Sequence, residues 1–149
     1  MYPLLAVLLS LASWSFAGSK TGWEDDYDKT LAKAKTEGRS VLLDFTGSDW
    51  CVWCIKLDTE VFPKPAFKRF AKEHLLLVEL DYPQLKRLPK KTQEQNAELK
   101  AKYGVSGFPT LILLNSEGKE VKRWGGYSAQ FFDELKAALP SESKSANAK

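Results

Sequence analysis

The chain has 149 residues, of which 44% are hydrophobic and 28% charged, and this composition is typical of one soluble globular domain with a single sizeable core. The formal net charge of +3 is mild and argues against a dedicated nucleic-acid binder, which concentrates basic residues on one face. The sequence contains no Gly-rich phosphate loop and no internal repeat.

The first 17 residues carry no charged side chain. The apolar run over residues 4–12 is followed by Ser15-Phe16-Ala17, the small-x-small pattern of a signal-peptidase site. We therefore expect residues 1–17 to be a secretory signal peptide cleaved after Ala17, and the protein to be periplasmic or secreted. An uncleaved anchor is the alternative, but a helix of this length spans only roughly 25 Å, which is short for a bilayer core.

Residues 18–22 are interpreted as a polar linker. Apolar residues at helical spacing then predict a helix over residues 23–37, with Gly38 as its C-cap. A nearly continuous apolar run predicts a strand over residues 41–46 that is buried on both faces, and Asp44 interrupts this run.

The same patterns predict the remaining elements, in chain order: helix 51–60, helix 66–73, strand 75–80, loop 81–91, helix 92–103, strand 111–114, strand 120–124 and helix 129–139. In the first of these helices we expect Ile55 and Leu57 to face the core. We expect Asp49 or Trp50 near the N-cap of that helix, and Ser128 at the N-cap of the last one.

Strands that alternate with helices predict parallel pairing first, and the turn signal over residues 115–118 predicts a closing antiparallel hairpin. The expected fold is therefore α/β, with a mixed central β-sheet flanked by helices on both faces. Residues 140–149 are polar and expected to be disordered, so the domain is predicted to cover residues 18–139.

Cys51 and Cys54 are the only cysteines, and their C-x-x-C spacing directly follows the first predicted strand. In the first turn of a helix, residues i and i+3 share one face, so the two sulfurs can close a small disulfide. The first sulfur would lie among the unpaired N–H groups at the positive end of the helix dipole, which favours thiolate over thiol.

Two other interpretations of this cysteine pair, a structural disulfide and a zinc site, are less well supported by the sequence. A bridge that closes so small a loop removes little chain entropy, so it is a poor structural staple. Half of a zinc site is disfavoured because zinc needs four ligands, and the chain offers two Cys and one His. We therefore expect a redox-active pair and no metal.

The order of the elements, the C-x-x-C at a strand-to-helix junction and Gly107-Phe108-Pro109-Thr110 before the third strand together resemble the thioredoxin superfamily, over about residues 23–139. The stretches 46–54 and 81–83 resemble exported bacterial thioredoxin-like proteins, and residues 49–54 also resemble the periplasmic C-terminal domain of the reductant carrier DsbD. The resemblance implies a thioredoxin fold and thiol–disulfide exchange.

The resemblance also implies catalytic roles at matching positions. Cys51 would be the exposed nucleophile and Cys54 the buried resolving thiol. Asp44 would be the buried carboxylate beneath them, which could accept the proton of Cys54; a structural hydrogen bond or an exposed strand end is the alternative. Glu79 falls near where thioredoxin carries a lysine, and an acid there would not favour an ionised Asp44.

Substrate binding is implied at a second set of positions. Pro109 would be a cis-proline facing the disulfide, and Phe108 would offer backbone groups to an extended substrate. Trp50, Trp53, Phe108 and Tyr127 could form an apolar rim around Cys51 that grips unfolded or extended protein segments.

The expected function is an exported thiol–disulfide oxidoreductase that reduces protein disulfides, because Trp53 places no positive charge beside the second cysteine, where oxidising relatives carry His. No cofactor is expected beyond the Cys51–Cys54 disulfide. Electrons would come from a membrane reductant carrier or a thioredoxin-type donor, and the protein is expected to be a monomer. The alternatives are an oxidase or isomerase with the same site, a client-binding module, and a structural protein stapled by the disulfide.

Overall fold

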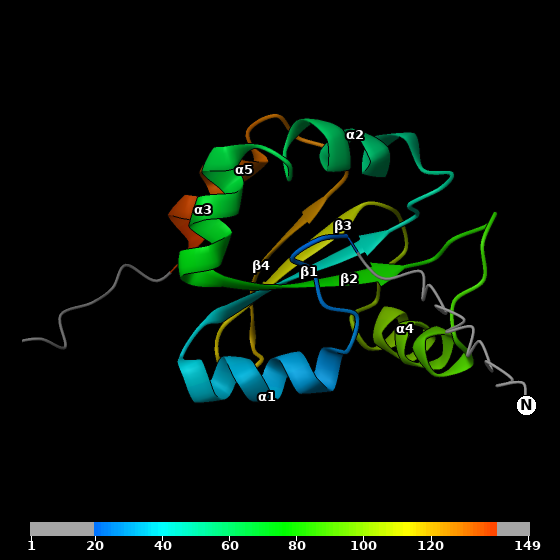
Figure 1. The fold of residues 1–149 in the computed structure, drawn as a ribbon, viewed down its shortest axis with the longest axis horizontal. Helices are drawn as coiled ribbons and strands as arrows, with labels where there is room; N and C mark the ends of the chain where they lie inside the picture. Colours follow the sequence, from blue (N-terminus) through cyan, green and yellow to red (C-terminus); the bar gives the residue numbers. More distant parts are fainter. Residues whose placement is uncertain (1–19, 140–149) are drawn as a thin grey trace, which may run out of the picture.

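Strand β1 (Ser40–Thr46) runs through the interior of a four-stranded sheet in the computed structural model, which describes residues 20–139 (Figure 1). The strand order is β2-β1-β3-β4, with β2 over Leu75–Asp81, β3 over Thr110–Leu114 and β4 over Glu120–Gly125. Strand β1 pairs in parallel with β2 and antiparallel with β3, and β3 pairs antiparallel with β4. The predicted mixed sheet is therefore confirmed.

Five helices within the described residues cover both faces of this sheet. Helices α1 and α4 lie on one face, and α2, α3 and α5 lie on the other (Figure 1). Their bounds are α1 Tyr27–Glu37, α2 Val52–Glu60, α3 Pro65–His74, α4 Lys90–Lys102 and α5 Phe131–Ala138.

Successive side chains of a strand point to opposite faces of the sheet, and here each face has its own hydrophobic cluster. Leu42 of β1 packs with residues of α2, α3 and α5, whereas Val41, Leu43 and Phe45 pack with residues of α1 and α4. Asp44 follows the parity of Leu42 and therefore belongs to the face covered by α2.

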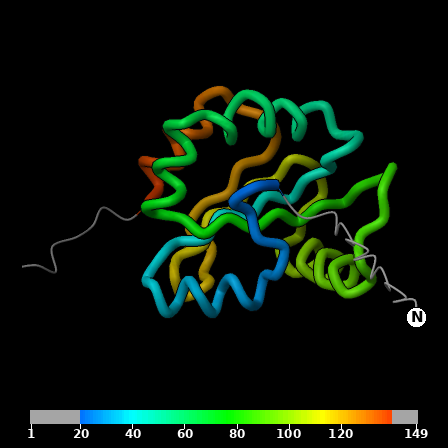
Figure 2. Tube along the Cα trace, in the orientation of Figure 1, coloured from blue at the N-terminus to red at the C-terminus, as the bar shows by residue number. Residues whose placement is uncertain are grey.

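The first helix begins later than predicted. Asp26 caps α1 by accepting the backbone N–H of Lys29, so the helix starts at Tyr27. Trp23 is buried ahead of the helix, and the neighbouring Glu24 forms a single parallel bridge with Val78 of β2. The segment before α1 therefore runs beside the outer strand of the sheet, as the trace in Figure 2 shows.

Two predictions about helix faces and caps were wrong. Ile55 is 40% exposed rather than inward-facing, because Cys54 and Leu57, three residues apart, already define the buried side of α2. Ser128 does not cap α5. The helix begins at Phe131 with Gln130 as its N-cap residue, and the Ser128 hydroxyl accepts the backbone N–H of Gln130 instead.

The predicted signal peptide and the predicted polar tail lie outside the described residues. Within residues 20–139, no helix combines the length and the apolar character that crossing a membrane requires.

Candidate active site

Cys51 and Cys54 form a disulfide at the first turn of α2, with their Cα atoms 5.2 Å apart. Cys51 is itself the N-cap residue, and its sulfur accepts the backbone N–H of Cys54 at 3.3 Å. The sulfur of Cys54 accepts the backbone N–H of Gly47 at 3.5 Å. When the disulfide is reduced, the helix dipole and the backbone N–H of Cys54 favour the thiolate of Cys51.

The two cysteines differ in exposure. Cys51 is 6% exposed and Cys54 is 1% exposed, so the nucleophile expected to be exposed is largely covered in the disulfide form, although it remains the more accessible sulfur-bearing residue. Of the two cysteines, Cys51 therefore lies nearer the surface, and Cys54 lies inside.

Asp49 does not cap α2. It stabilises the turn over residues 47–51, here called the cysteine turn, which leads into that helix. Its carboxylate accepts the backbone N–H groups of Gln84 at 2.9 Å and Leu85 at 2.8 Å. The bond from Gln84 is the main reason why the pKa of Asp49 is lowered. Trp50 adds a second tie, because its indole N–H donates to the carbonyl of Tyr82 at 2.8 Å. Hydrogen bonds therefore hold the loop after β2 against the cysteine turn.

Gly47 is required by the close packing of this turn. A Cβ atom at that position would lie 2.5 Å from the indole ring of Trp50, which is far inside van der Waals contact. Next along the chain, Ser48 donates to the carboxylate of Asp81 through both its backbone N–H and its hydroxyl, at 3.0 and 2.6 Å. The end of β2 thus holds the turn that presents the cysteines.

Aromatic side chains flank the disulfide in two groups. Trp50, 38% exposed, packs edge-on against Phe108 with ring centroids 5.8 Å apart, and Phe108 in turn contacts Tyr82 at 5.1 Å. Trp53, 54% exposed, stacks on Tyr127 at 5.9 Å. The structure thus places the four residues named for the rim in two aromatic pairs, Trp50 with Phe108 and Trp53 with Tyr127.

Pro109 lies at the same end of the sheet as the cysteine turn. The peptide bond between Phe108 and Pro109 is cis. The carbonyl of Pro109 accepts the backbone N–H of Gly126 at 2.8 Å. The next residue, Thr110, pairs with Phe45 near the end of β1, from which the chain continues into the cysteine turn.

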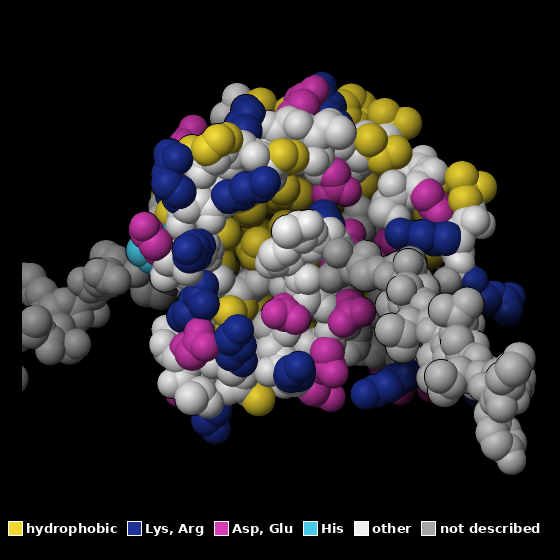
Figure 3. Space-filling model, in the orientation of Figure 1, with side chains coloured by type: hydrophobic (Ala, Val, Ile, Leu, Met, Phe, Trp, Pro, Cys, Tyr) yellow, Lys and Arg dark blue, Asp and Glu magenta, His cyan; other side chains and the backbone are white. Residues whose placement is uncertain are grey.

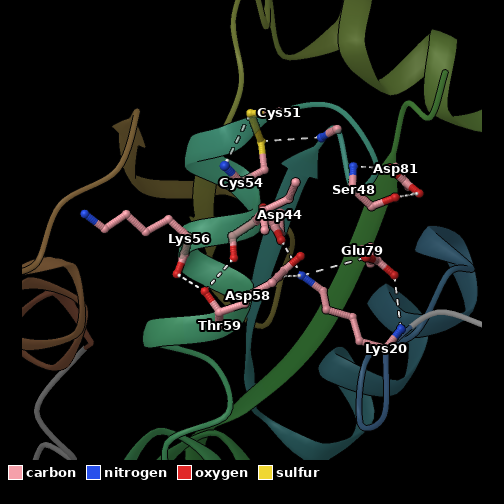
Figure 4. A network of polar contacts seen from close by, with 12 residues as sticks. Lys20, Asp44, Ser48, Cys51, Cys54, Lys56, Asp58, Thr59, Glu79 and Asp81 are labelled. Carbon is pink, nitrogen blue, oxygen red and sulfur yellow. Dashed lines mark hydrogen bonds and ion pairs between the residues drawn. A yellow bond between two sulfur atoms is a disulfide. The ribbon is translucent and has the colours of Figure 1, made fainter. Parts of the chain in front are cut away.

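Asp44 lies beneath α2 and is almost completely buried (Figure 4). One carboxylate oxygen, Oδ2, accepts a hydrogen bond from the Lys20 ammonium at 2.7 Å. The same ammonium lies 2.6 Å from Oδ1 of Asp58 in α2 and 3.8 Å from Oε1 of Glu79 in β2. The other oxygen of Asp44, Oδ1, has no hydrogen-bond partner among the described residues.

The electrostatics of this cluster have opposing causes. Burial raises the pKa of Asp44 above its ordinary value, and the attraction of Lys20 only partly offsets it. Burial raises the pKa of Glu79 in the same way. Burial alone would lower the pKa of Lys20, but the carboxylates of Asp44, Asp58 and Glu79 together raise it above its usual range. The lysine is therefore charged, and the two strand acids bind protons more tightly than free carboxylates do.

Lys20 was missed in the sequence, where it was assigned to a polar linker. A signal was present, because Asp44 and Glu79 each interrupt an apolar strand and neither strand offers a cation. The two acids are paired neighbours in the parallel ladder, so they need a positive charge from another segment. Only the folded chain shows that this segment is the one before α1. In the part of the chain that the structure describes, no group of three or more His, Cys, Asp or Glu is arranged to hold a metal ion.

Comparison with known proteins places this geometry in a family. Residues 27–140 match the family model described as thioredoxin-like domain. The disulfide bond reductase DsbH of Chlamydia pneumoniae is 40% identical over 126 residues, which cover 83% of this chain and 75% of that protein. DsbD 2, a thiol:disulfide interchange protein of Pseudomonas aeruginosa, is 38% identical over 95 residues, which cover 64% of this chain and 15% of that protein.

Solved structures agree with the sequence relatives. A structure described as DsbH oxidoreductase has a TM-score of 0.72 and 40% identity, and the match covers 84% of this chain and 88% of that one. The thioredoxin of Thermus thermophilus has a TM-score of 0.57 and 26% identity, with 74% and 82% covered. The implied thioredoxin fold is confirmed, and the redox centre of such proteins is the disulfide itself. The chain therefore belongs to the thioredoxin-like domain family, among the thiol–disulfide oxidoreductases that resemble DsbH.

Proposed function

We propose that the protein is an exported protein-disulfide reductase that works by dithiol–disulfide exchange through Cys51 and Cys54. The observation that carries the proposal is the position of the Cys51 sulfur at the N-cap of α2, where it accepts a backbone N–H. A thiolate formed there is stabilised, and the thiolate is the species that attacks a disulfide.

In the proposed cycle the Cys51 thiolate attacks a substrate disulfide and forms a mixed disulfide, releasing one substrate thiol. Asp44 accepts the proton of Cys54, and the Cys54 thiolate attacks the sulfur of Cys51. The internal disulfide forms, the mixed disulfide breaks and the second substrate thiol leaves. Two electrons pass from the cysteine pair to the substrate.

Two features support the reducing direction. Trp53 brings no charge beside Cys54, so the residue before the second cysteine adds no stabilisation to the reduced form. The relative from Chlamydia pneumoniae is described as a disulfide bond reductase and covers most of this chain.

The surface around the cysteines suits protein substrates. Figure 3 shows hydrophobic side chains gathered over the end of the molecule that carries α2. Large hydrophobic residues are exposed on three neighbouring segments: the cysteine turn, α2 and the loop after β2, which Asp49 holds against the cysteine turn. They are Trp50, Val52, Trp53, Ile55 and Leu85. Such a surface would bind an extended or unfolded segment, with the backbone of Phe108 beside Pro109 as a further anchor.

Localisation and partners complete the proposal. Export to the periplasm or beyond is proposed from the signal-like sequence of residues 1–17. A membrane reductant carrier of the DsbD type, or a thioredoxin-type protein, is proposed as the electron donor to a monomeric enzyme. No nucleic-acid partner is proposed.

The test is reduction of insulin with dithiothreitol as the electron source, comparing wild type with Cys51→Ser and Cys54→Ser. We expect Cys51→Ser to be inactive and Cys54→Ser to accumulate the mixed disulfide. If wild type and Cys51→Ser reduce insulin equally slowly, the enzymatic proposal fails. Equilibration with glutathione tests direction separately, because a potential near that of DsbA, about −120 mV, contradicts a reductase.

A further inference from the structure

Three carboxylates surround one ammonium group beneath the disulfide (Figure 4). They come from three elements: Asp44 from β1, Asp58 from α2 and Glu79 from β2. The ammonium of Lys20 donates hydrogen bonds to Asp44 and Asp58 and forms a longer ion pair with Glu79. With all three acids ionised, one positive charge faces three negative ones, so the state of Asp44 depends strongly on Lys20.

Lys20 is held in place by contacts of its own. Its backbone N–H donates to Oε2 of Glu79 at 3.2 Å. Its ammonium lies 4.2 Å from the ring centroid of Trp23 and 4.7 Å from that of Phe62, within the range of cation–π attraction. Its side chain is only 21% exposed. Glu79 therefore positions Lys20 through the backbone, and two rings position its charge.

We propose that Lys20 is a positioning residue for disulfide exchange, which holds Oδ2 of Asp44 and thereby leaves Oδ1 ionised and free to take the proton of Cys54. This inference rests on the proposed reductase function. Glu79 has an indirect part, because it fixes the segment that carries Lys20. Glu79 falls near the position where thioredoxin carries a lysine. In this chain the cation beside Asp44 is Lys20, which lies outside the sheet.

Release of the substrate consists of a proton transfer followed by thiol–disulfide exchange. The Cys54 thiol gives its proton to Oδ1 of Asp44, and the new thiolate forms the bond to the sulfur of Cys51. The bond between Cys51 and the substrate sulfur breaks, and that sulfur leaves with the electron pair. The departing thiolate or solvent then takes the proton from Asp44.

Removing the ammonium should disable this step at neutral pH. The charged and titratable groups that face Asp44 are Lys20, Asp58, Glu79 and Asp81, with the cysteines of α2 above. Lys20 is the only cation among them, and the nearby carboxylates and burial all favour a protonated Asp44. Without Lys20, Asp44 would keep its proton and could not accept another until the pH is higher.

The experiment follows the second thiolate released when reduced protein reacts with the chromogenic disulfide DTNB, a signal that reports attack by Cys54 on the mixed disulfide. Rates are measured across pH for wild type, Lys20→Met, Lys20→Arg and the surface control Lys90→Met. We expect Lys20→Met to move the midpoint of the profile upward by about one pH unit or more and to slow the step about tenfold at pH 7. Above the new midpoint its rate should approach that of wild type.

The controls separate positioning from damage to the fold. Lys20→Arg keeps the charge and should retain most of the wild-type profile, and Lys90→Met should retain all of it. The carboxyl ¹³C signal of Asp44 in the reduced protein gives a readout that needs no substrate, and it should titrate at higher pH in Lys20→Met.

A uniform loss of rate at every pH, or an unchanged titration of Asp44, overturns the role of Lys20. An unchanged profile in Lys20→Met with an active wild type does the same and leaves the reductase proposal intact. If wild type itself behaves like Cys51→Ser, the reductase proposal fails and the positioning role fails with it.

Discussion

The two faces of strand β1 are equally buried but chemically different. On the side of α1 and α4, Val41, Leu43 and Phe45 are all 0% exposed and belong to a hydrophobic cluster. On the side of α2, Leu42 is followed by Asp44, which is buried just as deeply. A buried carboxylate is expensive unless it is paired, so the second face is stable only with a specific cation in place.

The two faces of β1 therefore depend on different kinds of interaction. The apolar face should tolerate other apolar side chains of similar volume. The other face needs Lys20, Asp58 and Glu79 from three separate segments to accommodate one acid. That acid lies below the cysteines (Figure 4), and the following substitutions test the comparison of the two faces.

The largest effect is expected when the apolar face is made like the charged one. Leu43→Asp places a carboxylate among Val78 and Ile112, its neighbours in the sheet, with no cation opposite. We expect a loss of more than about 5 kcal/mol in the free energy of unfolding, enough to prevent folding. Circular dichroism and urea titration measure it, with Leu43→Met as the volume-matched control, and a folded Leu43→Asp would show that the two faces are equivalent.

Removing the cation from the charged face should have the next largest effect. Lys20→Met leaves three acids without their partner, and we expect a loss of about 3 kcal/mol in the free energy of unfolding. The double variant Lys20→Met/Asp44→Asn should recover at least half of that loss, and more than Asp44→Asn alone adds to wild type, because the acid most deeply buried is then neutral. Urea unfolding of the four members of this cycle gives the coupling free energy. A double variant as unstable as the sum of its parts would contradict the pairing.

Neutralising the acid itself should stabilise the protein in a pH-dependent way. The pKa of Asp44 is raised in the folded state, so above its ordinary value of 3.8 this carboxyl binds a proton more tightly in the folded protein than in the unfolded chain. The contribution of Asp44 to stability therefore falls as the pH rises from that value through its folded pKa. Asp44→Asn should be no more stable than wild type near pH 3 and about 1 kcal/mol or more stable at pH 7. Unfolding curves at both pH values decide it, and a variant less stable at pH 7 would refute the sign.

The smallest effect concerns charge above the disulfide rather than below it. Trp53→His introduces a group that stabilises the Cys51 thiolate when it is protonated, so the reduction potential should rise by about 30 mV or more. The rise should be larger at pH 6 than at pH 8, because His titrates near pH 6.5. Equilibration with glutathione measures the potential, and Trp53→Phe is the uncharged aromatic control. Equal potentials for the two variants at pH 6 would remove the argument from Trp53.

Local sequence was a good guide wherever contacts are local. The three apolar strands, the Gly38 cap and the closing hairpin are present as predicted. The errors arose where two signals competed over a few residues. Asp26 rather than the earlier Trp23 sets the start of α1, since a capping side chain outweighs apolar spacing at a helix end. Ile55 fits an apolar pattern by type but lies off the buried side of α2.

The sequence by itself determined the fold class and the family of this protein. Two cysteines at C-x-x-C spacing after a buried strand, with a Gly-Phe-Pro-Thr stretch ahead of another, carry the resemblance to the thioredoxin superfamily, because each motif is written in a few consecutive residues. Only the tertiary structure decided how the acid below them is compensated. Lys20 and Asp44 are 24 residues apart, and no periodicity joins them; they meet because the segment before α1 runs along β2. An electrostatic partnership of that kind depends on distance in space, which a linear pattern does not encode.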